Sequence, residues 1–156
     1  MIPPLDNRGL LPPGVHRIDA LDELPRRFCT NAHRWRLWDD VLAGLSEVCA
    51  LLHQHPAPMT RLVMGGSFFS DKPTPADLEA TLVFDAQTPG ATCWQWTLQH
   101  VQQHARLKER YRLDFYPSLP GHNDFGALFQ YVGPKTAALK GLDDKDPRGV
   151  IEVITW

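Results

Sequence analysis

Apolar side chains recur along this chain with a helical period in two stretches. Between His33 and His55 they return every three or four residues, which places them on one face of an α-helix. Asn31 is a suitable N-cap for this helix, and Pro56 cannot continue it. The same spacing predicts a second helix over Thr92–Tyr111.

Four shorter stretches are rich in apolar and β-branched residues and predict strands. They are Arg61–Met64, Leu78–Phe84, Leu113–Tyr116 and Val150–Ile154. Pro117 is expected to end the third of them, because proline cannot donate to a strand ladder. The order of helices and strands predicts an α+β fold (α/β-like), with a small mixed β-sheet flanked by helices.

The N-terminal part of the chain shows neither period. Residues 1–32 are rich in proline, and we expect them to form an arm, with a short helix near Leu21–Phe28, on a single domain of residues 1–156. Short helical segments are also predicted over Phe125–Tyr131 and Pro134–Leu139. The chain shows no internal repeat.

Composition and charge restrict the class of protein. A chain of 156 residues with 43% hydrophobic and 22% charged residues matches one globular domain. Its formal net charge of −2 does not favour general binding to nucleic acid or to an anionic membrane. No apolar run reaches about 18 residues, so no membrane association is expected. The N-terminus lacks a signal-peptide pattern and the three cysteines are scattered, which indicates a cytoplasmic protein with reduced thiols.

Three acidic residues suggest metal-dependent phosphate chemistry. Asp77 and Glu79 occupy alternate positions at the start of a predicted strand and therefore share one face of it. Asp114 begins another predicted strand and is the candidate third ligand. Carboxylate oxygens are the ligands that Mg²⁺ prefers, and two such ions can assist the attack and departure of oxygens on phosphorus. Acids near a strand start are also common at solvated edges, so the pattern has a purely structural reading too.

A glycine-rich turn precedes the acid pair. Gly65 and Gly66 would let the backbone approach a phosphate closely, and Ser67 adds a hydroxyl donor. Lys72 follows this turn and could contact a phosphate. Gly-Gly-Ser is also an ordinary turn sequence, so the argument depends on the turn and the acids occurring in this order.

This order of residues resembles a known superfamily. An apolar strand, Gly66-Ser67, a spacer of about ten residues and then acid-hydrophobic-acid is similar to the signature of polymerase-beta-type nucleotidyltransferases. Further likeness, to a group of small bacterial nucleotidyltransferase-like proteins, lies in residues 9–16, 71–75 and 114–117. The resemblance spans most of the chain, and its central motif is the specific part.

The resemblance implies roles for the residues of the motif. Gly66 and Ser67 would lie at the nucleotide phosphates, and Asp77, Glu79 and Asp114 would bind Mg²⁺ or Mn²⁺. The implied reaction transfers a nucleoside monophosphate from a nucleoside triphosphate to a protein, RNA or small-molecule acceptor. By analogy with small members of the superfamily, a protein partner in a toxin–antitoxin pair or in phage defence is also implied.

Two departures from the family pattern keep a second function open. Glu79 stands where aspartate is usual, and residues 69–72 lack a further glycine that many active members carry. The alternative is therefore a catalytically degenerate interaction module that retains the fold and binds a protein or a nucleotide.

Other polar residues have simpler explanations. His100 and His104 are four residues apart on a predicted helix and could share a metal, but no third ligand is evident and a solvated helix face explains them better. A basic stretch leads into Asp114 and is either a solvated face or a patch that receives triphosphate or nucleic acid. This stretch contains Arg106, Lys108, Arg110 and Arg112.

Overall fold

A mixed β-sheet forms the centre of the computed structural model, which describes residues 1–52, 61–84, 104–118, 121 and 123–156. The strand order is β1-β5-β2-β3-β4. The β1–β5 and β3–β4 pairs are parallel, whereas β2 runs antiparallel to both of its neighbours. The strands are β1 (Gly14–Ala20), β2 (Arg61–Gly65), β3 (Leu78–Val83), β4 (Leu113–Ser118) and β5 (Gly149–Thr155).

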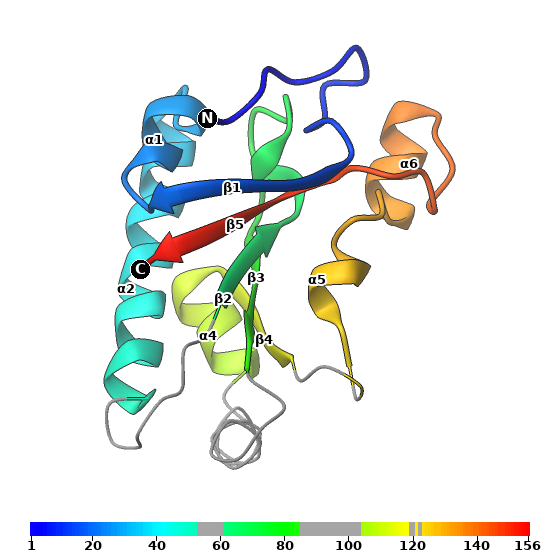
Figure 1. Ribbon diagram of the computed structural model, residues 1–156. Helices are drawn as coiled ribbons and strands as arrows, with labels where there is room; N and C mark the ends of the chain where they lie inside the picture. The colour runs from blue at the N-terminus through cyan, green and yellow to red at the C-terminus, as the bar shows by residue number, and fades with distance from the viewer. Residues whose placement is uncertain (53–60, 85–103, 119–120, 122) are drawn as a thin grey trace.

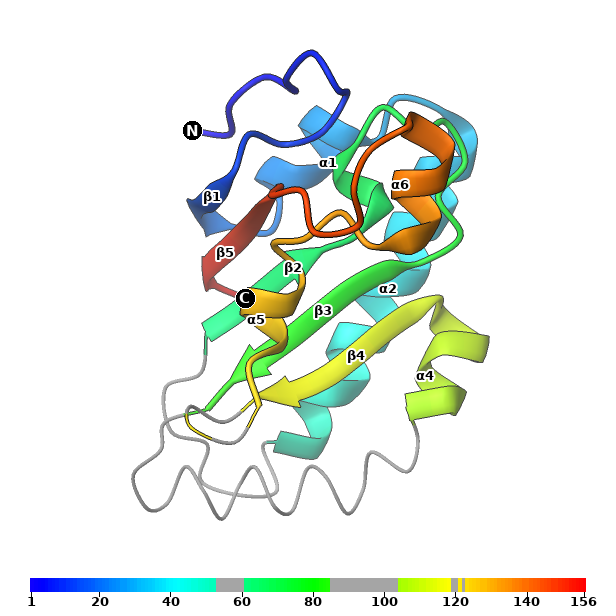
Figure 2. The ribbon, with the colours of Figure 1, turned by 90° about the vertical axis from the view of Figure 1, so that its right-hand side faces the viewer.

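Helices cover both faces of this sheet, which confirms the predicted α+β fold. The long helix α2 lies with α4 on one face, and α5 lies on the other (Figures 1 and 2). As predicted, Asn31 caps α2, because its Oδ1 accepts a hydrogen bond from the Arg34 amide at 2.9 Å. The helices are α1 (Glu23–Phe28), α2 (Ala32–Leu52), α4 (His104–Tyr111), α5 (Phe125–Leu128) and α6 (Pro134–Lys140), with a 3₁₀ turn, η1, at Ser67–Phe69.

Alternation along β3 gives the sheet two unlike faces. Leu78, Ala80 and Leu82 are fully buried on the face toward α2. Glu79 and Thr81 belong to the other face, where Thr81 exchanges a hydrogen bond of 2.7 Å with Ser118. The α2 side chains that complete the main core are Leu37, Trp38, Val41, Leu45 and Val48. The opposite face is thus free to carry polar chemistry.

Two predictions about the strands were wrong. Residues 14–20, expected within an N-terminal arm, form β1 in parallel register with β5. Only Ile18 is buried in this edge strand, so it lacks the apolar alternation that would reveal it. Pro117 does not end β4, because it pairs with Leu82 in the other edge strand, where a missing N–H can face away from the sheet.

Some predictions concern residues that the structure does not describe. The N-terminal part of the predicted helix 92–111, with His100, lies outside the described residues, as do His53 and His55. Of the helices in the described part of the chain, none is long and apolar enough to cross a membrane.

Candidate functional site

The three predicted acids meet on the polar face of the sheet. Glu79 and Asp114 are directly paired in the parallel register of β3 and β4. Asp77 comes two residues before Glu79, and it lines the same cleft of about 350 Å³ as the other two. This cleft, called the acid cleft below, brings together residues that lie far apart in the chain. Its charged walls are formed by Asp77, Glu79, Asp114, Lys72, Lys108, Lys135 and Arg148.

Lys108 connects two of the acids. It projects from the last turn of α4, and its Nζ lies 2.6 Å from Asp114 Oδ2 and 3.1 Å from Asp77 Oδ2. The hydrogen bond to Asp114 is the main reason that the pKa of Lys108 is raised, and Asp77 adds to the effect. The Lys108 side chain is 45% exposed, so the ammonium sits at the mouth of the cleft between two carboxylates.

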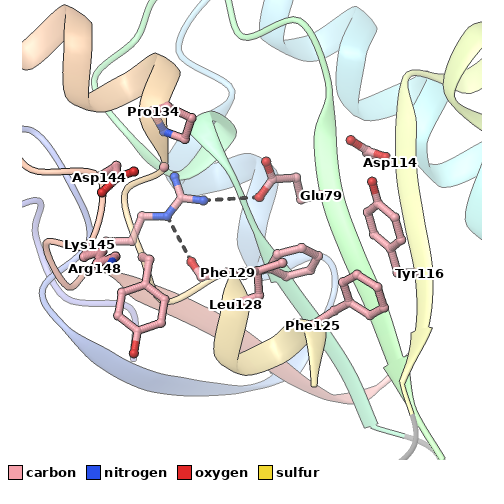
Figure 3. Close-up of a pocket in the computed structure, with 12 residues that line it drawn as sticks. Glu79, Asp114, Tyr116, Phe125, Leu128, Phe129, Pro134, Asp144, Lys145 and Arg148 are labelled. Carbon is pink, nitrogen blue, oxygen red and sulfur yellow. Dashed lines mark hydrogen bonds and ion pairs between the residues drawn. The ribbon is translucent and has the colours of Figure 1, made fainter. Parts of the chain in front are cut away.

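Asp114 also accepts a hydrogen bond from the Tyr116 hydroxyl, which points toward it in Figure 3. Burial, together with this hydrogen bond, raises the pKa of Tyr116 to about 12. Tyr116 therefore stays protonated at neutral pH and serves as a hydrogen-bond donor to the carboxylate.

The third acid is bound to a buried arginine. Arg148 donates from Nη2 to Glu79 Oε2 at 3.2 Å and from Nε to the Phe129 carbonyl at 3.0 Å (Figure 3). Burial raises the pKa of Glu79 and lowers that of Arg148, while their attraction opposes both shifts. Because the Arg148 side chain is only 7% exposed, this pair forms an inner wall of the cleft.

The two glycines make room for neighbouring side chains. A Cβ on Gly66 would lie 3.1 Å from Glu79 Cδ, and a Cβ on Gly65 would lie 2.8 Å from Phe129 Cβ. Gly66 has φ 87° and ψ −178°, a conformation that side-chain-bearing residues rarely adopt. These contacts give Gly66 a packing role beside Glu79 and Gly65 a packing role beside Phe129. The approach of this turn to a phosphate stays a prediction.

The rest of the turn carries polar groups into the cleft. Ser67 begins η1, and Ser67 and Lys72 both line the acid cleft. Lys135 and Thr136 of α6 line it as well. With four basic and three acidic side chains in its walls, the cleft has the charge needed to attract a phosphate chain and the carboxylates needed to hold a cation.

Arg34 was missed by the sequence analysis and holds this turn in place. The residue is 2% exposed, and its guanidinium donates to the carbonyls of Phe28, Phe68, Ser70 and Lys72 at distances of 2.6–3.3 Å. The sequence did contain an indication of this role, because Arg34 lies in register with the apolar stripe of α2. A charged residue on such a stripe must find buried acceptors.

The basic stretch before Asp114 is mostly paired with acids. Arg112 Nη2 lies 2.6 Å from Asp40 Oδ2, and Arg106 forms an ion pair with Glu47. These contacts favour the structural reading for both arginines. Among the described residues of this stretch, only Lys108 lines the acid cleft. The sequence pattern did not distinguish it from the three arginines beside it.

The carboxylates of the acid cleft are the groups that could bind a divalent metal. Asp77 and Asp114 already share one cation, the Lys108 ammonium, and both are oxygen donors of the kind that Mg²⁺ prefers. In the described residues, no group of three or more His, Cys, Asp or Glu is arranged to hold a metal ion. Of the three acids, Asp77 and Asp114 are thus the pair that could offer oxygen ligands to Mg²⁺ if Lys108 moved away, whereas Glu79 is bound to Arg148.

The comparisons with known proteins bear on the family but not on the activity. No curated protein and no solved structure matches the chain, so the resemblance to nucleotidyltransferases stays a prediction. The model of a family of unknown function (DUF6932) matches residues 3–154. Because this match covers nearly the whole chain, the protein belongs to that family, DUF6932.

Proposed function

We propose that this protein transfers a nucleoside monophosphate from a nucleoside triphosphate to a hydroxyl of a protein, RNA or small-molecule acceptor. The observation that carries the proposal is the meeting of Asp77, Glu79 and Asp114 with Ser67 in one cleft. The same residues carry the resemblance to polymerase-beta-type nucleotidyltransferases. Strands β3 and β4 supply Glu79 and Asp114, the segment before β3 supplies Asp77, and η1 supplies Ser67. The arrangement therefore depends on the fold and not on one local sequence.

Asp77 and Asp114 would hold Mg²⁺ or Mn²⁺ in place of the Lys108 ammonium, and Glu79 is the further oxygen donor beside them. Such ions, when bound, polarise the α-phosphate and neutralise the departing pyrophosphate. Lys108 is half exposed at the cleft mouth, so its side chain can move outward when a metal enters. From the mouth of the cleft its ammonium group would contact the phosphates of the nucleotide.

The remaining residues of the cleft would bind and orient the phosphate chain. Ser67, Lys72 and Lys135 provide a hydroxyl and two ammonium groups around it. In the reaction, the acceptor oxygen forms a bond to the α-phosphorus, the bond to the bridging oxygen breaks and pyrophosphate leaves. The acceptor proton passes to a carboxylate of the cleft.

The first experiment measures metal-dependent nucleotide binding. Each nucleoside triphosphate, with Mg²⁺ or Mn²⁺ at millimolar concentration, is expected to raise the melting temperature, because a ligand that binds only the folded state stabilises it. The triple variant Asp77→Asn, Glu79→Gln, Asp114→Asn is expected to lose this rise. An unchanged rise in that variant would place the metal and nucleotide elsewhere.

A matched control removes the same charges from exposed positions. The variant Asp19→Asn, Asp39→Asn, Glu109→Gln changes the net charge equally and should keep the full rise, since these side chains are exposed and do not line the cleft. Label transfer from α-³²P-labelled nucleotides to the protein, to RNA and to the product of a neighbouring gene then tests the chemistry. No transfer to any acceptor, together with no metal-dependent binding, rejects the enzyme.

A second candidate function is an interaction module without catalysis. It is favoured by the pairing of all three acids with bases of the same chain, Lys108 and Arg148, which compensates two of the three negative charges without a metal. Such a module would bind a protein partner, for example in a toxin–antitoxin pair or in phage defence. Partner binding that survives loss of the three acids would support the module over the enzyme.

A further inference from the structure

A second pocket, of about 670 Å³, adjoins the acid cleft on the same face of the sheet. Glu79, Asp114 and Arg148 line both hollows, so the two share a border. Figure 3 shows Phe125, Phe129 and Tyr116 on the side of this pocket away from Pro134. We call it the aromatic pocket.

The aromatic wall is built from rings that contact one another. Tyr116 of β4 stacks on Phe125 of α5, with ring centroids 4.4 Å apart and planes inclined by 15°. Phe129 is tilted against both of them, at 6.3 and 6.4 Å. These contacts fix the rings before any ligand arrives, so the wall is preorganised to receive a flat group.

Large side chains at the rim of the pocket remain exposed. Tyr131 is 49% exposed and Leu128 is 59% exposed, and both line the pocket. Burial of such side chains is favourable, so a ligand seated here would cover surface that the fold leaves in water. The aromatic pocket thus offers an apolar binding area that the sheet and its helices do not use.

The chemistry of the two hollows differs sharply. The acid cleft presents four bases and three acids, whereas the adjoining pocket presents mainly rings, with Asp144 and Lys145 as the polar groups that it adds. A ligand that fits both has a charged end and a flat aromatic end with polar edges. A nucleoside triphosphate has this form, and pockets of about 300–1,000 Å³ hold molecules of that size.

We propose that the aromatic pocket binds the base of the nucleotide whose phosphates lie in the acid cleft. The base lies against the wall formed by Tyr116, Phe125 and Phe129, with Tyr131 closing over it from the rim, and Asp144 and Lys145 reach its polar edges. This inference deepens the proposed function and rests on it for the placement of the phosphates. Stacking is tolerant of the base, so all four common nucleotides should bind.

The test separates the base from the phosphates. Binding of ATP, GTP, CTP, UTP and inorganic tripolyphosphate is measured by calorimetry with Mg²⁺, and binding of the free nucleosides is measured by ligand-observed NMR. Tyr131→Ala removes an exposed ring and should not unfold the protein. Phe125→Leu keeps an apolar side chain but removes stacking. Trp35→Ala, at a ring of similar exposure (47%) on α2, is the matched control.

The expected result is a nucleoside triphosphate affinity at least about tenfold above that of tripolyphosphate, the value of one stacked base. Tyr131→Ala and Phe125→Leu should each remove most of this difference and leave tripolyphosphate binding unchanged, and Trp35→Ala should alter neither.

Two outcomes overturn the inference: tripolyphosphate that binds as tightly as the nucleotides, or variants of the aromatic wall that leave the difference intact. The nucleoside measurements separate this failure from that of the proposed function. If no triphosphate binds but nucleosides do, and Tyr131→Ala abolishes their binding, the nucleotidyltransferase proposal fails while the aromatic pocket is supported as a base site.

Discussion

Replacing Arg34 with methionine is expected to destabilise the protein strongly and to loosen the turn that carries Ser67 and Lys72. The Arg34 guanidinium is buried between α2 and this turn, and it lies 5.2 Å from the centre of the Phe68 ring. It joins Phe28, at the end of α1, to the segment Phe68–Lys72 through hydrogen bonds to carbonyl oxygens. Methionine fills the space of the aliphatic stem but offers no donor.

The size of the effect follows from the acceptors that are left. Four carbonyl oxygens lose the guanidinium as their donor. A buried acceptor without a partner costs about 1–3 kcal/mol. The Phe28 carbonyl keeps the Thr30 amide as a donor, so three acceptors are left without one. Because the turn lies near the surface and can admit water, we take about 1 kcal/mol for each of the three, or about 3 kcal/mol in total. That is a large part of the roughly 5–15 kcal/mol that stabilises a typical domain.

Urea unfolding, followed by circular dichroism, measures this loss. Arg34→Lys retains the charge and up to three donors, so about half of the loss should be recovered. Arg36→Met, on an exposed position of the same helix, should change the free energy of unfolding by less than about 0.5 kcal/mol. Hydrogen exchange should accelerate at two amides of this turn. The Phe69 amide donates to the Gly66 carbonyl within the turn, and the Asp71 amide donates to the Gly9 carbonyl beside it.

A loss below about 1 kcal/mol for Arg34→Met would refute this reasoning, since the carbonyls of Phe68, Ser70 and Lys72 would then have found other donors at little cost. An equal loss for Arg36→Met would refute it as well, because the effect would belong to the helix and not to the guanidinium.

Three further predictions concern the acid cleft and the N-terminal segment. Lys108→Met should leave the two acids that it bridges to repel each other, so millimolar Mg²⁺ should raise the melting temperature more than in the unchanged protein; an equal rise would contradict this. Gly66→Ala should cost about 2 kcal/mol from backbone strain and contact with Glu79, and combining it with Glu79→Ala should cost less than the sum of the two changes in urea unfolding. Burial alone would raise the pKa of Asp6, but hydrogen bonds from the Arg8 side chain and from backbone amides hold it below its ordinary value of 3.8. Its contribution to stability is therefore complete above that value and lost as the pH falls through the lowered pKa. Asp6→Asn should flatten the profile of stability against pH on the acid side of 3.8, and an unchanged profile would contradict the assignment.

Local patterns in the sequence were sufficient for most of the described elements. The helical period of α2, the strand at Leu78–Val83 and the strand at Gly149–Thr155 were predictable, because each buries one face in the main core. The closeness of Asp77 and Glu79 likewise follows from local sequence, because Asp77 directly precedes β3 and Glu79 is the second residue of that strand. These features depend on neighbours within a few residues, which the sequence displays directly.

Edge strands were harder to predict. β1 pairs with β5 alone, and only Ile18 of it is buried, so its sequence lacks the repeated large apolar residues that mark a core strand. β4 includes Pro117, which a central strand would exclude and an edge strand accepts. Whether a strand lies at an edge is decided by the order of strands in the sheet, and no single segment contains that information.

Residue types and spacing along the chain were sufficient to name Asp77, Glu79 and Asp114 as candidates for phosphate chemistry, whereas the groups around them follow from the folded arrangement. Lys108 reaches Asp77, Arg148 reaches Glu79, and Arg34 reaches Lys72, across 31, 69 and 38 positions of the chain. The aromatic pocket likewise requires β4 and α5 to pack together before its rings form one wall. Ion pairs, burial and stacking act over a few ångströms in space, so they depend on folded proximity, which spacing along the chain does not record.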